Sequence, residues 1–499
     1  MKKFFVGVLL LLSGTVAAQN ERKLLYGNVE VGTYALSDST RIPFWLRTNR
    51  FGVVGLETPT ASVRAGLYYD YAPAPAGNRK PRAFDYGFGA EVVTNTLPGG
   101  QTRVILPELY AKARLGPFEL MAGRRREVTG LMDSTLTSGS FSISGNTLPI
   151  PRVQIGIMEY TDFGLTGGIL GIKGLYNHGW FENTRRTTRN NFLHQKALYG
   201  RIGKPTWPVR FHTGFTHQVQ WGGEADYEAD VNGRLPSDLW AYWRVITGVS
   251  IAGDTASVGK IHDSGNRIGN HLGSVDVGLE IGGPAFTVML YRQMFYDDGS
   301  LYYLTNIADG LNGVSLRFGD RGTGFRLTKI TAEFLYTMSQ GGGVFINEKE
   351  LYRGRDDYYN HAQFRDGWSY NGQTLGTPFI TPAINHRPEL QGAWFSNNNR
   401  VQVYHLGLAG GIGPGVRFEG KFSYSQNFGT YTTEFPEQID QVSALFRVSA
   451  PLRWLGGVEL NTAVGYDRGQ LYPDATTVYV GFKKTFSNTG FSYPWKLSF

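Results

Sequence analysis

The sequence predicts an all-β fold, a transmembrane antiparallel β-barrel of the kind that spans the outer membrane of Gram-negative cells. Three observations predict it. Short stretches of alternating apolar and polar residues recur along the chain, which is typical of strands with one face to lipid and one to the lumen. No stretch offers about 18 consecutive apolar residues, so no transmembrane helix is expected. The composition, with 66 Gly, 31 Phe, 28 Tyr and 10 Trp, suits many strands, tight turns and interfacial aromatic girdles.

The final nine residues show the alternation most clearly. Their apolar positions are Phe491, Tyr493, Trp495, Leu497 and Phe499, with polar residues or proline between them. An edge strand of a soluble β-sandwich alternates in the same way, but it would leave these large side chains to be covered at the end of the chain. We therefore favour a barrel strand. Tyr493, Trp495, Leu497 and Phe499 are the expected insertion signal that the barrel-insertion machinery reads.

Residues 1–18 resemble a secretory signal peptide. Two lysines supply the positive start, residues 6–12 form an apolar run too short to span a bilayer of about 30 Å, and small residues make a cleavage site. Cleavage would leave residues 19–499, which we expect to form a single barrel domain in the outer membrane. The chain has no Cys and therefore no disulfides. The formal charge of +8 falls to +6 when Lys2 and Lys3 are removed with the signal peptide, and a basic lumen or mouth favours anionic ligands such as acidic polysaccharide or lipopolysaccharide phosphates.

Between these ends the alternation predicts a series of strands. In order, they cover residues 25–34, 44–50, 62–70, 84–93, 109–115, 118–122, 197–202, 209–220, 275–280, 286–295, 313–318, 329–337, 401–409, 415–427, 441–450, 457–466 and 478–482, and residues 153–176 are also Gly-rich and alternating. Gly116 and Pro117 make a tight turn between two of these strands. Such a hairpin is the repeating unit of a barrel.

Two basic stretches interrupt the pattern. Arg124, Arg125 and Arg126 are adjacent, so at least one of them must lie in a loop or at a strand end. Either carboxylates on the barrel wall neutralise them, or they contact a polyanion. Residues 180–196 are basic and rich in Asn and Thr, which predicts an exposed loop. The longest interval without strand patterning, residues 341–399, is expected to be functional or to fold inward.

The stretch from Gln220 to Glu224, Gln-Trp-Gly-Gly-Glu, resembles the end of a strand in the Wzi capsule-assembly family. Residues 269–276, 291–299 and 359–376, the last with Arg-Asp-Gly-Trp, are similar to later family motifs in the same order. The resemblance implies an outer-membrane barrel of about 18 strands with a largely obstructed lumen. It also implies a lectin-like, non-enzymatic role, in which the protein binds capsular or exopolysaccharide and helps attach or assemble it at the cell surface.

One departure from the family concerns the amino-terminal region. Better-known members carry a helical segment between signal peptide and barrel, whereas strand patterning here begins near Leu25. Any contact with export machinery made through such helices is therefore in doubt.

The candidate polysaccharide-binding residues combine aromatic rings with charged groups, because sugars stack their apolar faces on rings and hydrogen-bond to polar groups. They are Trp221, Glu224, Arg124, Arg125, Arg126, Arg365, Asp366, Trp368 and Tyr370. Trp221 ends a strand before two glycines and Glu224 begins a polar loop, so both could face one sugar across a bend. The alternative is that Trp221 belongs to the interfacial aromatic girdle and Glu224 pairs with a lumen arginine.

Other function classes have less support. The sequence lacks Gly-x-Ser-x-Gly, His-Glu-x-x-His and any Cys, so we expect no enzyme, no cofactor and no metal site. No nucleic-acid recognition motif is present. A porin-like channel or transporter for small or anionic solutes is the remaining alternative, since a barrel of this size can leave an aqueous path. We expect a monomer in contact with outer-membrane lipid and lipopolysaccharide.

Overall fold

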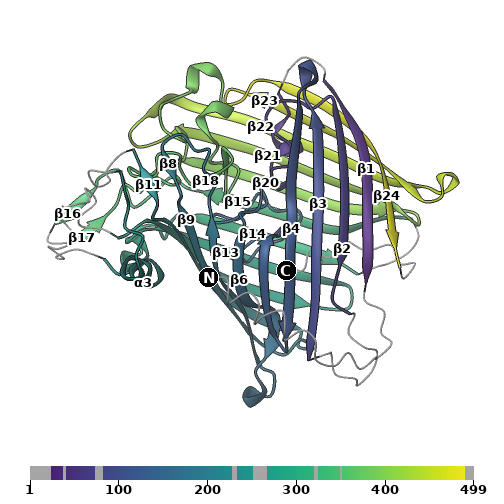
Figure 1. Cartoon of the computed structure of the whole chain (residues 1–499), viewed down its shortest axis with the longest axis horizontal. Helices are drawn as coiled ribbons and strands as arrows, with labels where there is room; N and C mark the ends of the chain where they lie inside the picture. The colour runs from purple at the N-terminus through teal and green to yellow at the C-terminus, as the bar shows by residue number, and fades with distance from the viewer. Residues whose placement is uncertain are drawn as a thin grey trace, which may run out of the picture.

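The computed structural model describes residues 24–36, 41–72, 83–226, 233–250, 267–319, 324–348 and 351–488. Within these residues, eighteen strands form one closed antiparallel barrel (Figure 1). They are β1 (Leu25–Leu36), β2 (Ala61–Tyr69), β3 (Phe84–Thr96), β4 (Thr102–Leu115), β5 (Phe118–Arg124), β6 (Arg152–Asp162), β7 (Leu170–Trp180), β9 (Phe192–Ile202), β10 (Val209–Trp221), β12 (Asn270–Gly282), β13 (Phe286–Asp297), β14 (Gly310–Phe318), β15 (Phe325–Tyr336), β20 (Val401–Ile412), β21 (Val416–Gly429), β22 (Glu434–Leu452), β23 (Val458–Gly469) and β24 (Ala475–Ser487). The predicted all-β barrel and its strand number are confirmed.

The ring closes between the first and last described strands. Each barrel strand pairs with its neighbour in chain order, and β24 pairs with β1 with Gly481 opposite Gly32. The signal peptide predicted for residues 1–18 and the insertion signal, Tyr493, Trp495, Leu497 and Phe499, lie outside the described residues. Both stay predictions.

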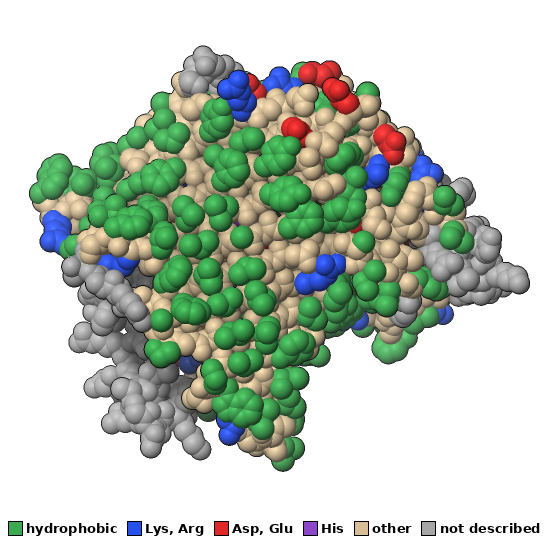
Figure 2. Space-filling view, turned by 180° about the vertical axis from the view of Figure 1, so that it is seen from behind, with side chains coloured by type: hydrophobic (Ala, Val, Ile, Leu, Met, Phe, Trp, Pro, Cys, Tyr) green, Lys and Arg blue, Asp and Glu red, His purple; other side chains and the backbone are tan. Residues whose placement is uncertain are grey.

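Side chains alternate between the two faces of the wall, as the pleat of a strand requires. On β3, Phe84, Tyr86 and Phe88 are exposed, whereas Asp85 and Asn95 on the other face are buried. Hydrophobic side chains cover much of the outer surface (Figure 2). This arrangement, apolar outside and polar inside, is the one that a barrel needs in lipid. Among the described helices, none has the length and hydropathy needed to cross a membrane.

The two ends of the barrel differ in the length of their connections. At one end most connections are short, as at Gly116–Pro117 between β4 and β5 and at residues 413–415 between β20 and β21. At the other end, which we call the long-loop end, residues 125–151 and 337–400 connect neighbouring strands. Because outer-membrane barrels keep short turns on the periplasmic side, the long-loop end faces the cell exterior.

The strand predicted for residues 44–50 is wrong. Residues Phe44–Arg47 form a short helix, α2, whose four side chains are all buried. The Phe44 amide donates to Asp467 of β23 (2.7 Å), and the Trp45 indole donates to the Ser423 hydroxyl of β21 (3.1 Å). Both partners face inward, so α2 lies inside the barrel. A fully buried segment has no polar face, so alternation is no guide to its conformation.

Residues 127–151 form a second segment inside the barrel, and they contact inward-facing side chains of widely separated strands. These contacts are hydrogen bonds from the Leu131 amide to Asp276 on β12 (2.8 Å), from the Ser138 amide to Glu333 on β15 (2.6 Å) and from the His405 ring on β20 to the Leu136 carbonyl (2.6 Å). Buried polar groups on the wall are thereby satisfied by backbone groups of one enclosed segment.

The long interval from residue 341 to residue 399 folds onto this enclosed segment. The Tyr359 hydroxyl donates to the Phe141 carbonyl, and the Trp368 indole donates to the Ser142 carbonyl (2.7 Å). The interval contains the hairpins β16 (Ile346–Glu348) with β17 (Leu351–Arg353) and β18 (Ser369–Tyr370) with β19 (Gln373–Thr374), and the single turns η3 (Ala383–Asn385) and η4 (Pro388–Leu390).

The exposed loop predicted for residues 180–196 is wrong in two respects. Its last residues already belong to β9, and Thr188–Arg189 form the short strand β8, which pairs with β11 (Glu224–Ala225). Arg185 is only 7% exposed, and its guanidinium donates to the carbonyls of Gly367 (3.0 Å) and Ser369 (2.9 Å). A basic side chain here binds backbone carbonyls of another loop, which composition alone cannot reveal.

Candidate functional site

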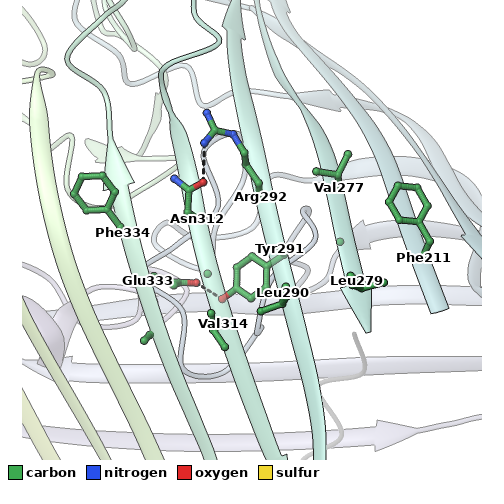
Figure 3. A pocket seen from close by; sticks show the side chains of 13 residues that line it. Phe211, Val277, Leu279, Leu290, Tyr291, Arg292, Asn312, Val314, Glu333 and Phe334 are labelled. Atoms are coloured by element: carbon green, nitrogen blue, oxygen red, sulfur yellow. Dashed lines mark hydrogen bonds between the residues drawn. The ribbon is translucent and has the colours of Figure 1, made fainter. Parts of the chain in front are cut away.

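One groove, of about 620 Å³, lies on the outer face of the wall across β10 to β15 (Figure 3). Its lining includes the exposed side chains of Phe211, Leu290 and Val314. The Arg292 guanidinium donates to the Asn312 side chain (2.7 Å) on the same outer face. Because this face is the apolar one, the groove meets lipid and is a poor site for a water-soluble ligand.

A second pocket, of about 350 Å³, lies at the long-loop end, and we call it the long-loop pocket. Four segments distant in the sequence meet there: the connection that contains α2, the β3–β4 turn, the enclosed segment 127–151 and the β18–η3 region. The polar residues that line it are Glu57, Asn95, Arg103, Thr147, Tyr370, Asn371, Gln373 and Asn385, and the apolar ones include Val54, Leu56, Leu97, Ile105, Leu148 and Ile384.

The β18–β19 hairpin places two amides at this pocket. Its turn is Asn371–Gly372, and both residues have positive φ (49° and 71°), the combination that a tight two-residue hairpin turn requires. The backbone N–H of Asn371 donates to the Glu182 carboxylate (2.8 Å), which fixes the turn against the loop after β7. The side chain of Asn371 is exposed and that of Gln373 is partly exposed. Both can therefore meet a ligand that enters from outside.

Asn385, at the end of η3, is the most unusual residue of the pocket. It is 2% exposed, and neither its Nδ2 nor its Oδ1 has a hydrogen-bond partner among the described residues. A buried polar group without a partner costs about 1–3 kcal/mol. A ligand that offers both an acceptor and a donor would remove this cost.

The charged groups of the pocket are few and lie at its mouth. Glu57 and Arg103 are both exposed, and the Asn95 amide deeper in the pocket donates to the Val53 carbonyl (2.8 Å). Neutral amides beside apolar side chains such as Leu56 and Ile384 suit a ligand rich in hydroxyl groups with apolar faces.

Two of the predicted site residues, Arg124 and Tyr370, meet beside this pocket. β5 ends at Arg124, and its guanidinium donates to the Tyr370 hydroxyl (2.7 Å). Tyr370 is 1% exposed and its backbone carbonyl accepts from the Thr147 hydroxyl (2.8 Å), so its ring contributes to the pocket wall.

Arg125 and Arg126 form ion pairs with carboxylates, which is the first of the two alternatives for the arginine cluster. Arg125 pairs with Glu119 (2.6 Å) and with Glu127, and Arg126 pairs with Glu91. Burial would raise the pKa of Glu127, but Arg125 and a second arginine outweigh it and lower that pKa to about 2. Contact of the cluster with a polyanion stays a prediction.

Asp366 and its neighbours hold loops together. The Asp366 carboxylate accepts hydrogen bonds from the Thr187 amide (2.9 Å) and hydroxyl (2.7 Å). These bonds lower the pKa of Asp366 although burial opposes them. Trp368 is fully buried, and the Arg365 guanidinium lies 5.3 Å from the centre of the Trp394 ring. Of this predicted group, only Tyr370 lines the long-loop pocket.

Trp221 and Glu224 are separated by the bend that the sequence predicts. Trp221 ends β10 and is 3% exposed, and its ring stacks on Tyr242 with centroids 5.1 Å apart. Glu224 is exposed, and its backbone pairs with Arg189 in the β11–β8 ladder. In this arrangement the Trp221 ring has no free face for a sugar, and the joint role of the two residues stays a prediction.

No motif in the sequence marks the amides of the long-loop pocket, Asn371, Gln373 and Asn385. The signal that existed was compositional, because residues 371–399 are rich in Asn and Gln. Among the described residues, no group of three or more His, Cys, Asp or Glu side chains is arranged to hold a metal ion.

Comparison with known proteins gives a family and a fold. A family model described as "Capsule assembly protein Wzi" matches residues 16–477. The similar solved structures include Wzi of Escherichia coli, described as an outer membrane protein involved in group 1 capsule assembly and as a carbohydrate-binding β-barrel. It has a TM-score of 0.57 and 14% identity, and the match covers 92% of this chain and 84% of that one. At this identity the likeness shows a shared fold.

Two further similar structures are OccK5 (OpdH) and OprD of Pseudomonas aeruginosa. Their TM-scores are both 0.44, and their identities are 11% and 9%. The matches cover 93% and 94% of this chain, and 97% and 96% of those chains. No curated protein sequence matches the chain.

Proposed function

The chain belongs to the Wzi capsule-assembly family, and on that premise we propose that this outer-membrane barrel holds capsular or exopolysaccharide at the cell surface through its long-loop pocket. The family favours this role over a porin-like channel. Carbohydrate binding is described for Wzi of Escherichia coli, and we propose it for this chain as well.

The choice of this pocket as the binding site rests on one observation. The buried side-chain amide of Asn385 has no hydrogen-bond partner among the described residues, and it lies in a pocket that opens at the long-loop end. A sugar presents hydroxyl groups that donate and accept, so one residue of glycan can satisfy both atoms of the Asn385 side chain. Asn371 and Gln373 supply further amides at the mouth, and Leu56 and Ile384 supply apolar surface for the faces of the sugar ring.

The proposed role is binding without catalysis. Glycoside hydrolysis ordinarily needs two carboxyl groups that flank the scissile bond, roughly 5–9.5 Å apart. Among its described lining residues the pocket has a single carboxylate, Glu57, and that side chain is exposed at the mouth. A set of neutral amides can hold a sugar but offers no acid or base of suitable pKa.

The proposal includes a lumen that conducts little. The contacts of the enclosed segment 127–151 with strands on different sides of the wall support it, as does the packing of Tyr359 and Trp368 on that segment. A single barrel in a planar bilayer should therefore carry little steady current. A large and steady current would favour the porin alternative instead.

Capsule retention tests the proposed role. A deletion strain should shed capsule into the medium, and wild-type protein should restore capsule to the cells. Asn385→Leu, which fills the amide's place with a side chain of similar size, should fold and insert normally but restore retention poorly. Full retention with Asn385→Leu at wild-type protein level would remove this pocket from the proposal, and retention in the deletion strain itself would remove the role.

A further inference from the structure

The helix α3 (Leu239–Thr247) lies in the long connection between β10 and β12 and is built to pack on one side. Its amino terminus is capped by Asp238, whose side chain accepts from the Ala241 amide (2.7 Å), and Gly248 ends it in the left-handed conformation (φ 65°). Ala241 and Val245, one turn apart, are fully buried. One stripe of the helix therefore faces protein.

The surface under this stripe is the outer face of the barrel wall. On β7, Asn177 faces inward and bonds to Gln195, so the neighbouring Tyr176 faces outward. The Tyr176 hydroxyl lies 2.8 Å from the Tyr242 hydroxyl of α3. On β9, Lys196 also faces outward, and its ammonium donates to the Ile246 carbonyl of α3. The helix thus lies outside the barrel, beside the strands (Figure 1).

The outward residues that α3 covers include several polar rings as well as the apolar Val219 and Trp221. His194, His217 and His271, on β9, β10 and β12, lie beneath or beside the helix and are at most 6% exposed. Toward the end of the barrel that is opposite the long-loop end, Leu198 on β9 is 61% exposed and Phe211 on β10 is 41% exposed. The presence of buried polar rings among the outward residues indicates the edge of the apolar belt, and α3 lies at that edge.

The side of α3 that faces away from the barrel is apolar. Leu239 is 87% exposed, Trp243 is 64% exposed and Trp240 is 40% exposed. The Arg244 guanidinium lies 5.0 Å from the centre of the Trp240 ring. Trp beside a cation is the composition that prefers the boundary between hydrocarbon and headgroups, where an amphipathic helix can lie flat.

We propose that α3 is a membrane-surface helix, with Leu239, Trp240 and Trp243 inserted among the lipids of the outer leaflet. We expect lipid to contact this exposed side of α3, because the helix continues the apolar outer surface that contains Leu198 and Phe211 toward the long-loop end. The most exposed residue of the helix is leucine, which gains most from hydrocarbon. The helix also separates the row of histidines from the lipid, where polar rings would be costly.

Site-directed spin labelling tests this placement, and the absence of Cys from the chain makes every introduced Cys unique. The labelled variants are Leu239→Cys and Trp243→Cys on α3, with Leu198→Cys as the lipid control and Glu389→Cys, exposed on η4, as the water control. Each protein is placed in vesicles that contain lipopolysaccharide. The relative access of oxygen, which dissolves in lipid, and of a nickel chelate, which stays in water, is measured by electron paramagnetic resonance.

We expect the oxygen-to-nickel access ratio at both α3 positions to exceed that at Glu389→Cys several-fold and to approach that at Leu198→Cys. A ratio at both α3 positions equal to that at Glu389→Cys would overturn the proposal. So would a large loss of oxygen access when capsular polysaccharide is added, since the surface would then belong to glycan. Heat-modifiable gel migration shows that each variant is folded, and the two α3 positions serve as independent checks.

Discussion

The guanidinium of Arg124 donates a hydrogen bond of 2.7 Å to the hydroxyl of Tyr370, a residue 246 positions farther along the chain. This contact ties the end of a wall strand to the hairpin that carries Asn371 and Gln373. The geometry of the long-loop pocket therefore depends on the place at which β5 stops.

Tyr370→Phe removes this hydrogen bond and keeps the ring. Because hydrogen bonds to charged groups contribute about 1.5–3 kcal/mol, we expect a loss of that size in the free energy of unfolding, measured by urea titration. Arg124→Gln should cost a similar amount, and the double variant should cost clearly less than the two single losses together. Strict additivity would show that the two side chains do not stabilise each other.

Asn385→Leu should leave thermal stability unchanged or raise it, because it removes a buried amide that has no partner among the described residues. Asn360→Leu is the matched control in the same loop. Its amide donates to Asp357 (2.9 Å) and to the Ser396 carbonyl (2.8 Å), so its loss should destabilise by about 1–3 kcal/mol. Equal losses at both positions would mean that Asn385 has a partner in the folded protein.

Acid should weaken the cluster around Glu127. Its pKa is lowered to about 2, below the ordinary 4.5, so the folded state binds this proton less readily than the unfolded state. The stabilisation is complete above pH 4.5 and is lost as the pH falls toward 2, with a slope of at most about 1.4 kcal/mol per pH unit. Unfolding free energies measured across this range should fall less steeply in Glu127→Gln than in wild type. Parallel pH profiles would contradict the assignment.

Salt should weaken binding of purified capsule if the glycan is anionic, because ions screen exposed charges beyond about 8 Å at physiological ionic strength. Among the described residues that line the pocket, Arg103 is an exposed cation, so Arg103→Gln should reduce the salt dependence of binding. Arg126→Gln, at a residue paired with Glu91, should lower stability but leave the salt dependence of binding unchanged. Binding by wild type that does not respond to salt would indicate a neutral glycan.

Deletion of Phe499, or its replacement by a charged residue, should sharply lower the amount of protein in the outer membrane. The reason is the apolar face that Phe499 completes in the final stretch, which we expect the insertion machinery to read. Membrane fractionation with heat-modifiable migration measures the effect, and Ser498→Ala is the control on the opposite face. Wild-type levels without Phe499 would refute the predicted signal.

The barrel could be predicted from the sequence because its wall follows a simple rule. Most lipid-facing positions carry an apolar side chain, so alternate residues such as Phe84, Tyr86 and Phe88 indicate a strand. The same rule fails where a segment lies inside the barrel. Phe44 and Trp45 of α2 are buried on all sides, and no period distinguishes a buried helix from a buried strand over four residues.

The candidate site was far less predictable. The sequence predicts both Tyr370 and Trp368 as aromatic partners for sugar, but Tyr370 lines the pocket whereas Trp368 is fully buried. Trp221 looked like a platform at a strand end, and only the structure places Tyr242 of α3 over it. No local sequence motif marks Asn385, because the pocket that it lines is formed by four segments that meet only in the folded chain.

The enclosed segment 127–151 sets a condition on the order of assembly. Once β24 pairs with β1, the wall is continuous around a stretch of chain that bonds to β12, β15 and β20. Both ends of this stretch join the wall at the long-loop end, so in a closed ring it can enter only through that mouth. The interval 341–399 packs on this stretch through Tyr359 and Trp368, so the stretch has to dock before that interval folds over it. A variant that delays the docking of Leu131 or Ser138 would therefore also delay the packing of the interval 341–399, even in a barrel whose ring is already closed.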